Sequence, residues 1–161
     1  MSYMLCMLLA ILSFGIIMLI AAKEDLKSYD VSGELCVIWW VMCFACEFFM
    51  GRNWIIITAM IFMCVVFYYP KDIPFFGDAD ILPFASYLAV YVNSDLNYMA
   101  PLLYLFALGL SLVPYGVMWG RKNGVRWYIG SKIEMPVLPC FAAAWIISGI
   151  CYFVLAVMIG V

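Results

Sequence analysis

The chain has 161 residues, of which 69% are hydrophobic and only 11% are charged, with a formal net charge of −2 and no histidine. A soluble domain of this length carries about 25% charged residues, so the composition excludes an ordinary soluble domain. The mean hydropathy of +1.10 comes from apolar blocks that recur along the chain. We therefore expect an all-α, polytopic membrane protein in which residues 1–161 form a single integral membrane domain.

The apolar blocks predict about six membrane spans, because a helix needs about 20 apolar residues to cross a bilayer. The first block has no basic residue before it, so we expect it to stay as a helix and not to be removed as a signal peptide. The fourth block is the shortest and needs neighbouring protein or a thinner bilayer around it. The expected spans are Tyr3–Ala22, Leu35–Met50, Trp54–Tyr69, Asp80–Val92, Met99–Trp119 and Val137–Val161.

Basic residues predict the orientation of these spans. Seven of the eight lysines and arginines fall in the segments after the first, third and fifth spans, and only Arg52 lies on the opposite side. Cytoplasmic segments of membrane proteins are enriched in lysine and arginine, so this bias places those three segments in the cytoplasm. Because six spans put both termini on one side, both termini are then extracytoplasmic.

Acidic residues gather on the same predicted cytoplasmic side. Four of the ten occupy the segment Glu24–Glu34, and three occupy the segment Asp72–Asp80. The ordinary polarity of loops accounts for most of them. Asp25 and Asp80 differ, because each lies where a loop meets an apolar helix, and ionisable groups so close to hydrocarbon are costly and often functional.

Two carboxylates at a membrane surface suit aspartyl proteolysis. The ionised group removes a proton from a water molecule held between the two, while the protonated group polarises the carbonyl of the scissile bond. Such a pair shares one proton, because two like charges in proximity separate their pKa values. The sequence supplies both groups, and their meeting in space remains an expectation.

The segment DLKSYDVS, which begins at Asp25, resembles the first motif of the type IV prepilin peptidases and archaeal preflagellin peptidases. In that family an aspartate after the first helix is followed six residues later by Ile or Val, and Val31 stands at the matching position. The chain departs from the family where Ser32 and Gly33 replace the common Pro-Asn, and where Tyr29 replaces a frequent Arg.

The segment Gly77-Asp78-Ala79-Asp80 resembles the second motif of the same family, Gly-x-Gly-Asp, in its variant with Ala as the third residue. This alignment assigns catalysis to Asp80. Residues two apart on a helix point about 200° from one another, so Asp78 and Asp80 cannot both face one partner. Asp78 suits the N-cap of the fourth helix. Leu82 replaces the Lys that many bacterial members carry.

Two alternatives to this pair of residues remain open. An alignment that starts at Phe75 selects Asp78 as the catalytic residue, but it lacks the first glycine of the motif. In the first motif, Glu24 and Asp30 are the rivals of Asp25, and we expect both to be solvated loop charges. A third similarity to the family, the Pro-x-x-Pro sequence that starts at Pro136, precedes the last span.

The helix dipole predicts different roles for the two catalytic aspartates. A helix start favours an anion and a helix end disfavours it, so we expect Asp80 to be the base and Asp25 the acid. Because Asp25 is expected in a hydrated loop, little would fix it against Asp80. We therefore expect the two carboxylates to be more than a hydrogen bond apart without substrate.

The family resemblance implies an aspartic endopeptidase that removes the short basic leader from prepilin or preflagellin-like precursors at the cytoplasmic face of a prokaryotic cell membrane. The expected partners are such a precursor and membrane lipids, without nucleic acid. No organic cofactor or metal is expected, since histidine is absent and the chain has one C-x-x-C pair, Cys43 and Cys46. The alternative is a catalytically inactive relative or a small six-helix transporter or channel component.

Two further features have structural interpretations. Glu47 is expected near the outer end of the second span, where its side chain would reach towards Arg52 at the surface. Four glycines are expected to permit close packing of helices. They are Gly15, Gly109, Gly116 and Gly149.

Overall fold

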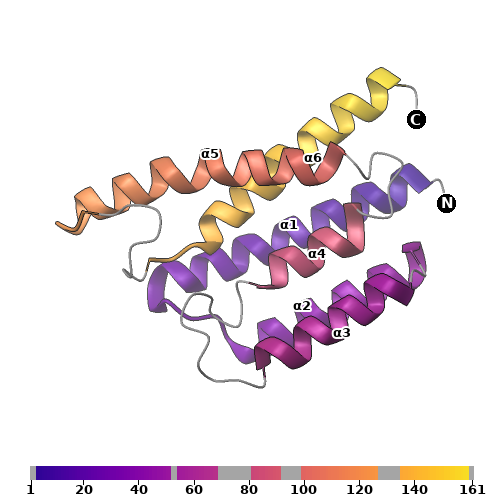
Figure 1. Cartoon of the computed structure of the whole chain (residues 1–161), viewed down its shortest axis with the longest axis horizontal. Helices are drawn as coiled ribbons and strands as arrows, with labels where there is room; N and C mark the ends of the chain where they lie inside the picture. Colours follow the sequence, from indigo (N-terminus) through magenta and orange to yellow (C-terminus); the bar gives the residue numbers. More distant parts are fainter. Residues whose placement is uncertain (1–2, 52–53, 69–80, 92–98, 127–134, 160–161) are drawn as a thin grey trace.

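The computed structural model describes residues 3–51, 54–68, 81–91, 99–126 and 135–159. All regular elements in these ranges are helices, which confirms the all-α prediction (Figure 1). They are α1 (Tyr3–Ser28), α2 (Gly33–Cys46), the π-helix η1 (Glu47–Gly51), α3 (Trp54–Tyr68), α4 (Leu82–Tyr91), α5 (Met99–Lys122) and α6 (Leu138–Ile159).

Three of these helices are long and apolar enough to cross a membrane. The candidate spans are Leu5–Ser28 in α1, Leu102–Lys122 in α5 and Leu138–Met158 in α6, and the apolar helix α4 is shorter. Large apolar side chains are exposed along the outer faces of these helices, including Leu12 and Phe106. Exposure of such an extended apolar surface to water would cost free energy. The exposed surface is compatible with a protein surrounded by lipid.

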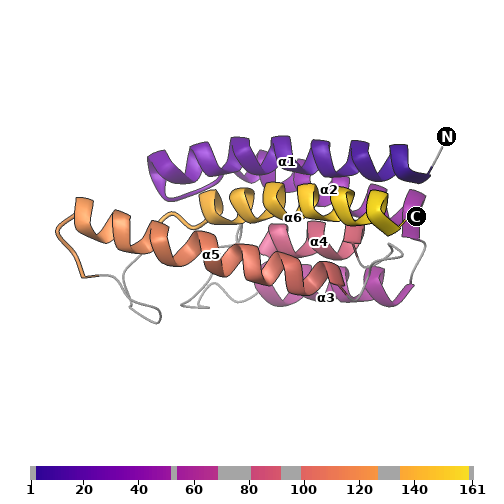
Figure 2. The same cartoon turned by 90° about the horizontal axis from the view of Figure 1, so that it is seen from above.

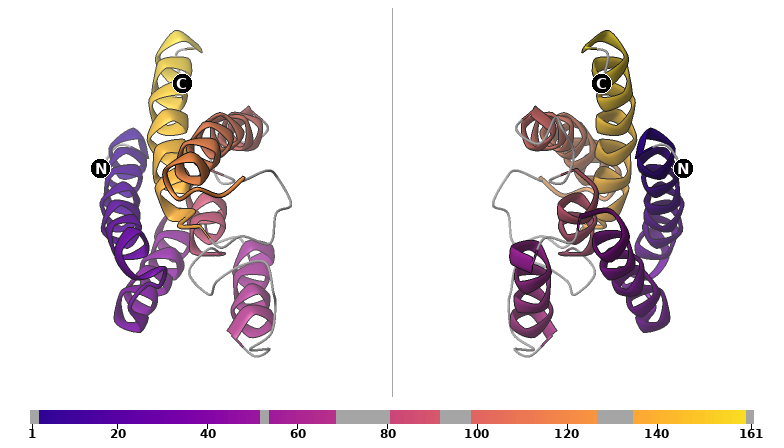
Figure 3. Two further views of the ribbon diagram at one scale, coloured as in Figure 1. Left: turned by 90° about the vertical axis from the view of Figure 1, so that its left-hand side faces the viewer. Right: turned by 90° about the vertical axis from the view of Figure 1, so that its right-hand side faces the viewer.

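The helices lie side by side, and each runs opposite to the one before it (Figures 1 and 2). α6 packs against α1 on one side and against α5 on the other. α4 lies under this layer and contacts both α1 and α2, whereas α3 stands at the edge and packs lightly on α4 (Figure 3). The start of α1 and the end of α6 lie at the same end of the bundle (Figure 1).

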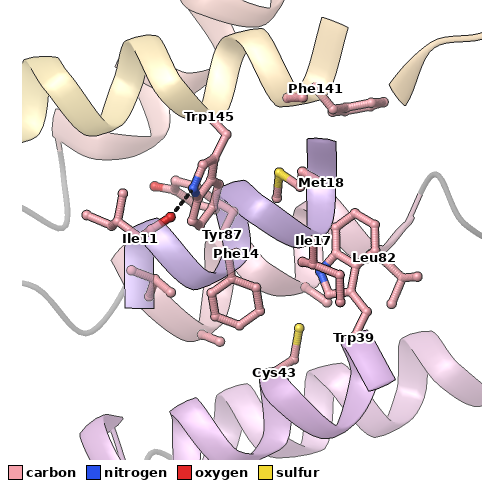
Figure 4. Packing of buried hydrophobic residues seen from close by; sticks show 14 of the residues in the cluster. Ile11, Phe14, Ile17, Met18, Trp39, Cys43, Leu82, Tyr87, Phe141 and Trp145 are labelled. Carbon is pink, nitrogen blue, oxygen red and sulfur yellow. Dashed lines mark hydrogen bonds between the residues drawn. The ribbon is translucent and has the colours of Figure 1, made fainter. Parts of the chain in front are cut away.

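Two glycines lie in the contact between α1 and α6. A Cβ atom on Gly149 of α6 would lie 3.1 Å from Cγ2 of Ile11, and a Cβ on Gly15 of α1 would lie 3.6 Å from the Trp145 ring. The Trp145 indole packs beside Gly15, where a Cβ would be at ordinary van der Waals distance, and its Nε1 donates a hydrogen bond to the Ile11 carbonyl at 2.9 Å (Figure 4). Gly149 therefore permits close packing, as the sequence predicts, whereas the space beside Gly15 would also accept a Cβ atom.

Gly109 of α5 does not follow that prediction. No atom lies within 4 Å of the position that its Cβ would occupy. The residue is exposed on the outer face of α5, so a side chain there would extend away from the bundle.

A buried hydroxyl group joins α2 to α4 on the other side of the core. Ser86 accepts a hydrogen bond from Nε1 of Trp39 at 2.6 Å and donates one to the Leu82 carbonyl at 2.9 Å. Both side chains of this contact between the helices are fully buried. The Trp39 N–H and the Ser86 hydroxyl are therefore both satisfied, as burial of polar groups in an apolar interior favours.

The predicted boundaries differ most at the first helix. α1 ends at Ser28, six residues beyond the predicted end at Ala22. Charged residues end an apolar segment, but they do not necessarily end a helix. Lys, Glu and Leu are good helix formers, and α1 continues through Lys27. α5 likewise continues beyond Trp119 to Lys122. α2 was predicted as one regular helix, but it changes to the π-helix η1 at Glu47.

The two glycines Gly149 and Gly109 give a matched test of this packing. We expect Gly149→Leu to lower the midpoint of thermal unfolding in detergent, because overpacking of a filled contact costs about 1–3 kcal/mol. Gly109→Leu introduces the same side chain on an open face and should leave the midpoint unchanged or raise it. Equal loss of stability in both variants would contradict the close contact between α1 and α6.

Candidate active site

Asp25 lies within the last turn of α1 and is buried, with 8% of its surface exposed. The expectation of a hydrated loop aspartate is therefore wrong. The physical reason is that α1 continues past its apolar part and carries Asp25 against the start of α6. Only two carboxylates are buried among the described residues, and the other is Glu47.

The partner of Asp25 is the first turn of α6, 113 positions further along the chain. The Leu138 backbone N–H donates a hydrogen bond to Oδ2 of Asp25 at 3.0 Å, and the Val137 amide also acts on this carboxylate. The first N–H groups of a helix have no acceptor inside the helix. The Asp25 carboxylate supplies one, so it caps α6 from another part of the chain.

The sequence at the start of α6 leaves few other donors there. Pro139, the second residue of α6, has no N–H, and the Cys140 N–H already donates to the Val137 carbonyl at 2.9 Å. Leu138 is therefore the donor in this turn that needs an acceptor. The Pro-x-x-Pro sequence that was noted only as a family similarity thus lies directly at Asp25.

The charge of Asp25 is influenced by two helix ends at once. The end of α1 disfavours an anion, whereas the start of α6 favours one and donates its N–H directly. Burial of Asp25 disfavours its charged form, whereas the Leu138 N–H favours it, so the expectation that Asp25 is the acid stays a prediction. Tyr115 of α5 and Cys140 of α6 also lie close enough to interact electrostatically with the carboxylate.

The two rivals of Asp25 have a different environment. Asp30 is exposed and its Oδ1 accepts a hydrogen bond from the Val31 N–H at 2.8 Å. Glu24 is partly exposed, and its Oε2 accepts from the Ser32 N–H at 2.9 Å, just before α2. Both carboxylates thus stabilise the turn between α1 and α2, and burial distinguishes Asp25 from them.

The turn after Asp25 positions Val31, the residue that matches the first motif. Tyr29 has a φ of 57°, in the left-handed region that residues other than glycine rarely adopt. This conformation ends α1 abruptly, after the Tyr29 N–H has bonded the Asp25 carbonyl at 3.0 Å. The chain then turns back and buries Val31 in the core with 7% exposure.

The second motif cannot be placed beside this site. Gly77, Asp78, Ala79 and Asp80 lie outside the residues that the structure describes. The distance between Asp25 and Asp80, and the N-cap role of Asp78, therefore remain predictions. The first described turn of α4 begins at Leu82, two positions after Asp80, and Leu82 is fully buried.

Glu47 is a second candidate for a functional residue, and its burial was not expected from the sequence. Its predicted role as a surface residue is wrong, because none of its surface is exposed. Glu47 follows Trp40 by seven positions and Cys43 by four, so it continues the buried face of α2. That face and η1 pack against α4, and this cover by another helix is what the sequence interpretation did not include.

No group of three or more His, Cys, Asp or Glu residues that could hold a metal ion occurs within the described ranges. Comparisons with protein families, curated proteins and solved structures find no family model, relative or structure that matches this chain. The chemistry of the site therefore rests on its own residues.

The contribution of Asp25 to the stability of the fold can be measured separately from any role in catalysis. Asp25→Asn keeps an oxygen that accepts from Leu138, whereas Asp25→Leu has a similar size and leaves the buried N–H without an acceptor. An unsatisfied buried group costs about 1–3 kcal/mol, so Asp25→Leu should unfold at a lower temperature than Asp25→Asn in detergent. A Leu variant as stable as the Asn variant would contradict the bond to α6.

Proposed function

We propose that this chain is a membrane-embedded aspartic endopeptidase of the prepilin peptidase type, with Asp25 and Asp80 as its catalytic pair. The observation that carries the proposal is the environment of Asp25. Asp25 is buried and its carboxylate is held by a backbone amide, so its position is fixed. A solvated carboxylate in a loop would not be held in one position in this way. The second motif supports the proposal from sequence alone.

The proposed orientation places this site at the cytoplasmic face. Lys27 in the last turn of α1 and Arg121 and Lys122 in the last turn of α5 lie at the same end of the bundle as Asp25 (Figure 1). Basic residues concentrate on the cytoplasmic side of membrane proteins. In this proposal α2 with η1, α3 and α4 cross the membrane together with the three longer helices, and both termini are extracytoplasmic.

The proposed substrate is a prepilin or preflagellin-like precursor, which has a short basic leader followed by a hydrophobic helix. Its scissile bond lies at the boundary of these two parts, where the helix enters the bilayer. Asp25 occupies the equivalent level in this chain, since it lies at the end of an apolar helix. One carboxylate activates a water molecule and the other, protonated, polarises the scissile carbonyl.

Glu47 favours the alternative function, that of a small transporter or channel component. Ionisable residues buried in membrane helices often mark an ion or proton pathway, and broken helices are typical of transporters. Glu47 is fully buried where α2 changes to η1. The peptidase proposal remains the stronger one, because a single buried glutamate has no matching partner motif in the sequence.

Co-expression with a panel of precursors that have a basic leader, a glycine and a hydrophobic helix tests the proposal. Asp25→Asn and Asp80→Asn should each lower leader removal at least about 100-fold, because each variant loses a group that transfers protons. Asp78→Asn should keep substantial activity, since Asn caps helices about as well as Asp. Leader removal is scored on gels, with membrane insertion of each variant as the control.

Three outcomes would contradict the proposal in different ways. Loss of activity only in the Asp78 variant would show that the second motif is aligned wrongly. Inhibition by EDTA that added zinc reverses would exclude the mechanism with two carboxylates. A well-folded wild-type chain that cleaves no precursor of the panel, in cells and after purification, would favour the inactive relative or the transporter.

A further inference from the structure

The start of α6 has a feature that the proposed function does not use. Its first amide is bonded to the carboxylate that we assign to catalysis, although the two groups are far apart in the sequence. A hydrogen bond to a carboxylate is stronger than one between neutral groups. Burial of both partners, with Leu138 exposed by 2% and Asp25 by 8%, lowers the competition of water for this bond.

We propose that the first turn of α6 positions Asp25 for catalysis: the Leu138 N–H holds Oδ2, and Oδ1 is the oxygen that meets water and substrate. This inference rests on the proposed function and adds a positioning residue to the same site. Leu138 acts through its backbone amide, so it touches neither water nor substrate and is not itself catalytic.

Geometry supports the assignment of the two oxygens. Within the described part of the chain, the hydrogen bond from Leu138 is made to Oδ2, at 3.0 Å. An oxygen that accepts an N–H from a helix start is a poor site for a proton of its own. The Val137 amide also acts on this carboxylate. Because Oδ2 accepts the Leu138 N–H, the proposal assigns proton transfer to Oδ1, whether Asp25 acts as acid or base.

The sequence of this turn makes the amide a rigid donor. Pro136 precedes it and Pro139 follows it, and a proline ring fixes φ at about −65°. The Cys140 N–H and the Phe141 N–H both donate to the Val137 carbonyl, which closes the first turn. The carboxylate of Asp25 is thus held by a group whose own orientation is fixed, which is what positioning to a fraction of an ångström requires.

Contacts further along the same two helices keep this geometry. The Trp145 Nε1–H bond to the Ile11 carbonyl and the close approach at Gly149 prevent α6 from sliding along α1. The separation of Asp25 from Leu138 is therefore set by the packing of the whole helix pair and not by the two residues alone.

Leu138→Pro and Leu138→Ala form the matched pair that tests the inference. Both variants lose the leucine side chain, but only the proline variant loses the N–H, and proline is well tolerated at the first position of a helix. The KM and kcat of leader removal are measured for purified wild type and both variants. We expect kcat of Leu138→Pro to fall about 100-fold below that of Leu138→Ala, with KM unchanged, since a misplaced catalytic group costs about that factor.

A second variant covers the case in which Leu138→Pro does not fold. Incorporation of the α-hydroxy analogue of leucine at position 138 replaces the amide by an ester, which removes the N–H and keeps the side chain. The same fall in kcat is expected. Equal kcat in the variants with and without the N–H would overturn the inference, while cleavage by wild type would leave the proposed function standing.

Infrared spectroscopy tests the bond independently of activity. With 13C-labelled aspartate, subtraction of the Asp25→Asn spectrum isolates the carboxyl bands of Asp25. These bands should shift between Leu138→Ala and the variant without the N–H. Identical bands would overturn the inference, even if wild-type protein cleaved no precursor and the proposed function failed.

Discussion

The hydrogen bond between the Leu138 amide and the Asp25 carboxylate joins the last helix of the bundle to the end of the first. It satisfies the first N–H of α6, and it orders a carboxyl group at the edge of an apolar bundle. The bond exists because α1 and α6 are antiparallel neighbours whose ends meet at one level. Their close approach at Gly149 and the hydrogen bond from Trp145 to the Ile11 carbonyl determine that level.

The two buried carboxylates differ in their surroundings. Asp25 lies at the end of the bundle where the basic residues of α1 and α5 occur, and it caps a helix that starts beside it. Glu47 lies after the last residue of α2, where α2 changes to the π-helix η1. A carboxylate at an interface can exchange protons with water and meet a substrate. A carboxylate sealed inside the bundle needs a separate pathway for either event.

The sequence predicted the helices well, because long apolar runs show directly where a helix is stable in lipid. It could not predict that α1 continues through its charged residues, since Lys and Glu end an apolar run without ending a helix. Gly109 and Gly149 look alike in sequence, and only the packing of neighbouring helices distinguishes them.

The candidate site also combines features that the sequence predicts with features that it could not predict. The choice of Asp25 came from motif spacing, but its burial depends on a residue 113 positions away that no local pattern reveals. Glu47 was misplaced because the sequence does not show that α4 covers the face of α2 that Glu47 shares with Trp40 and Cys43. Asp80 was chosen from its motif, and its position lies outside the described residues.

The central claim is that Asp25 and Asp80 converge on one substrate, and cross-linking measures this most directly. In a cysteine-free background, cysteines replace both aspartates, and a control pair carries cysteines in place of exposed Asp30 and of Asp80. A short cross-linking reagent should give a higher yield for the first pair when an uncleavable precursor is added, because docking brings the two positions together. An equally low yield with and without the precursor would contradict the account.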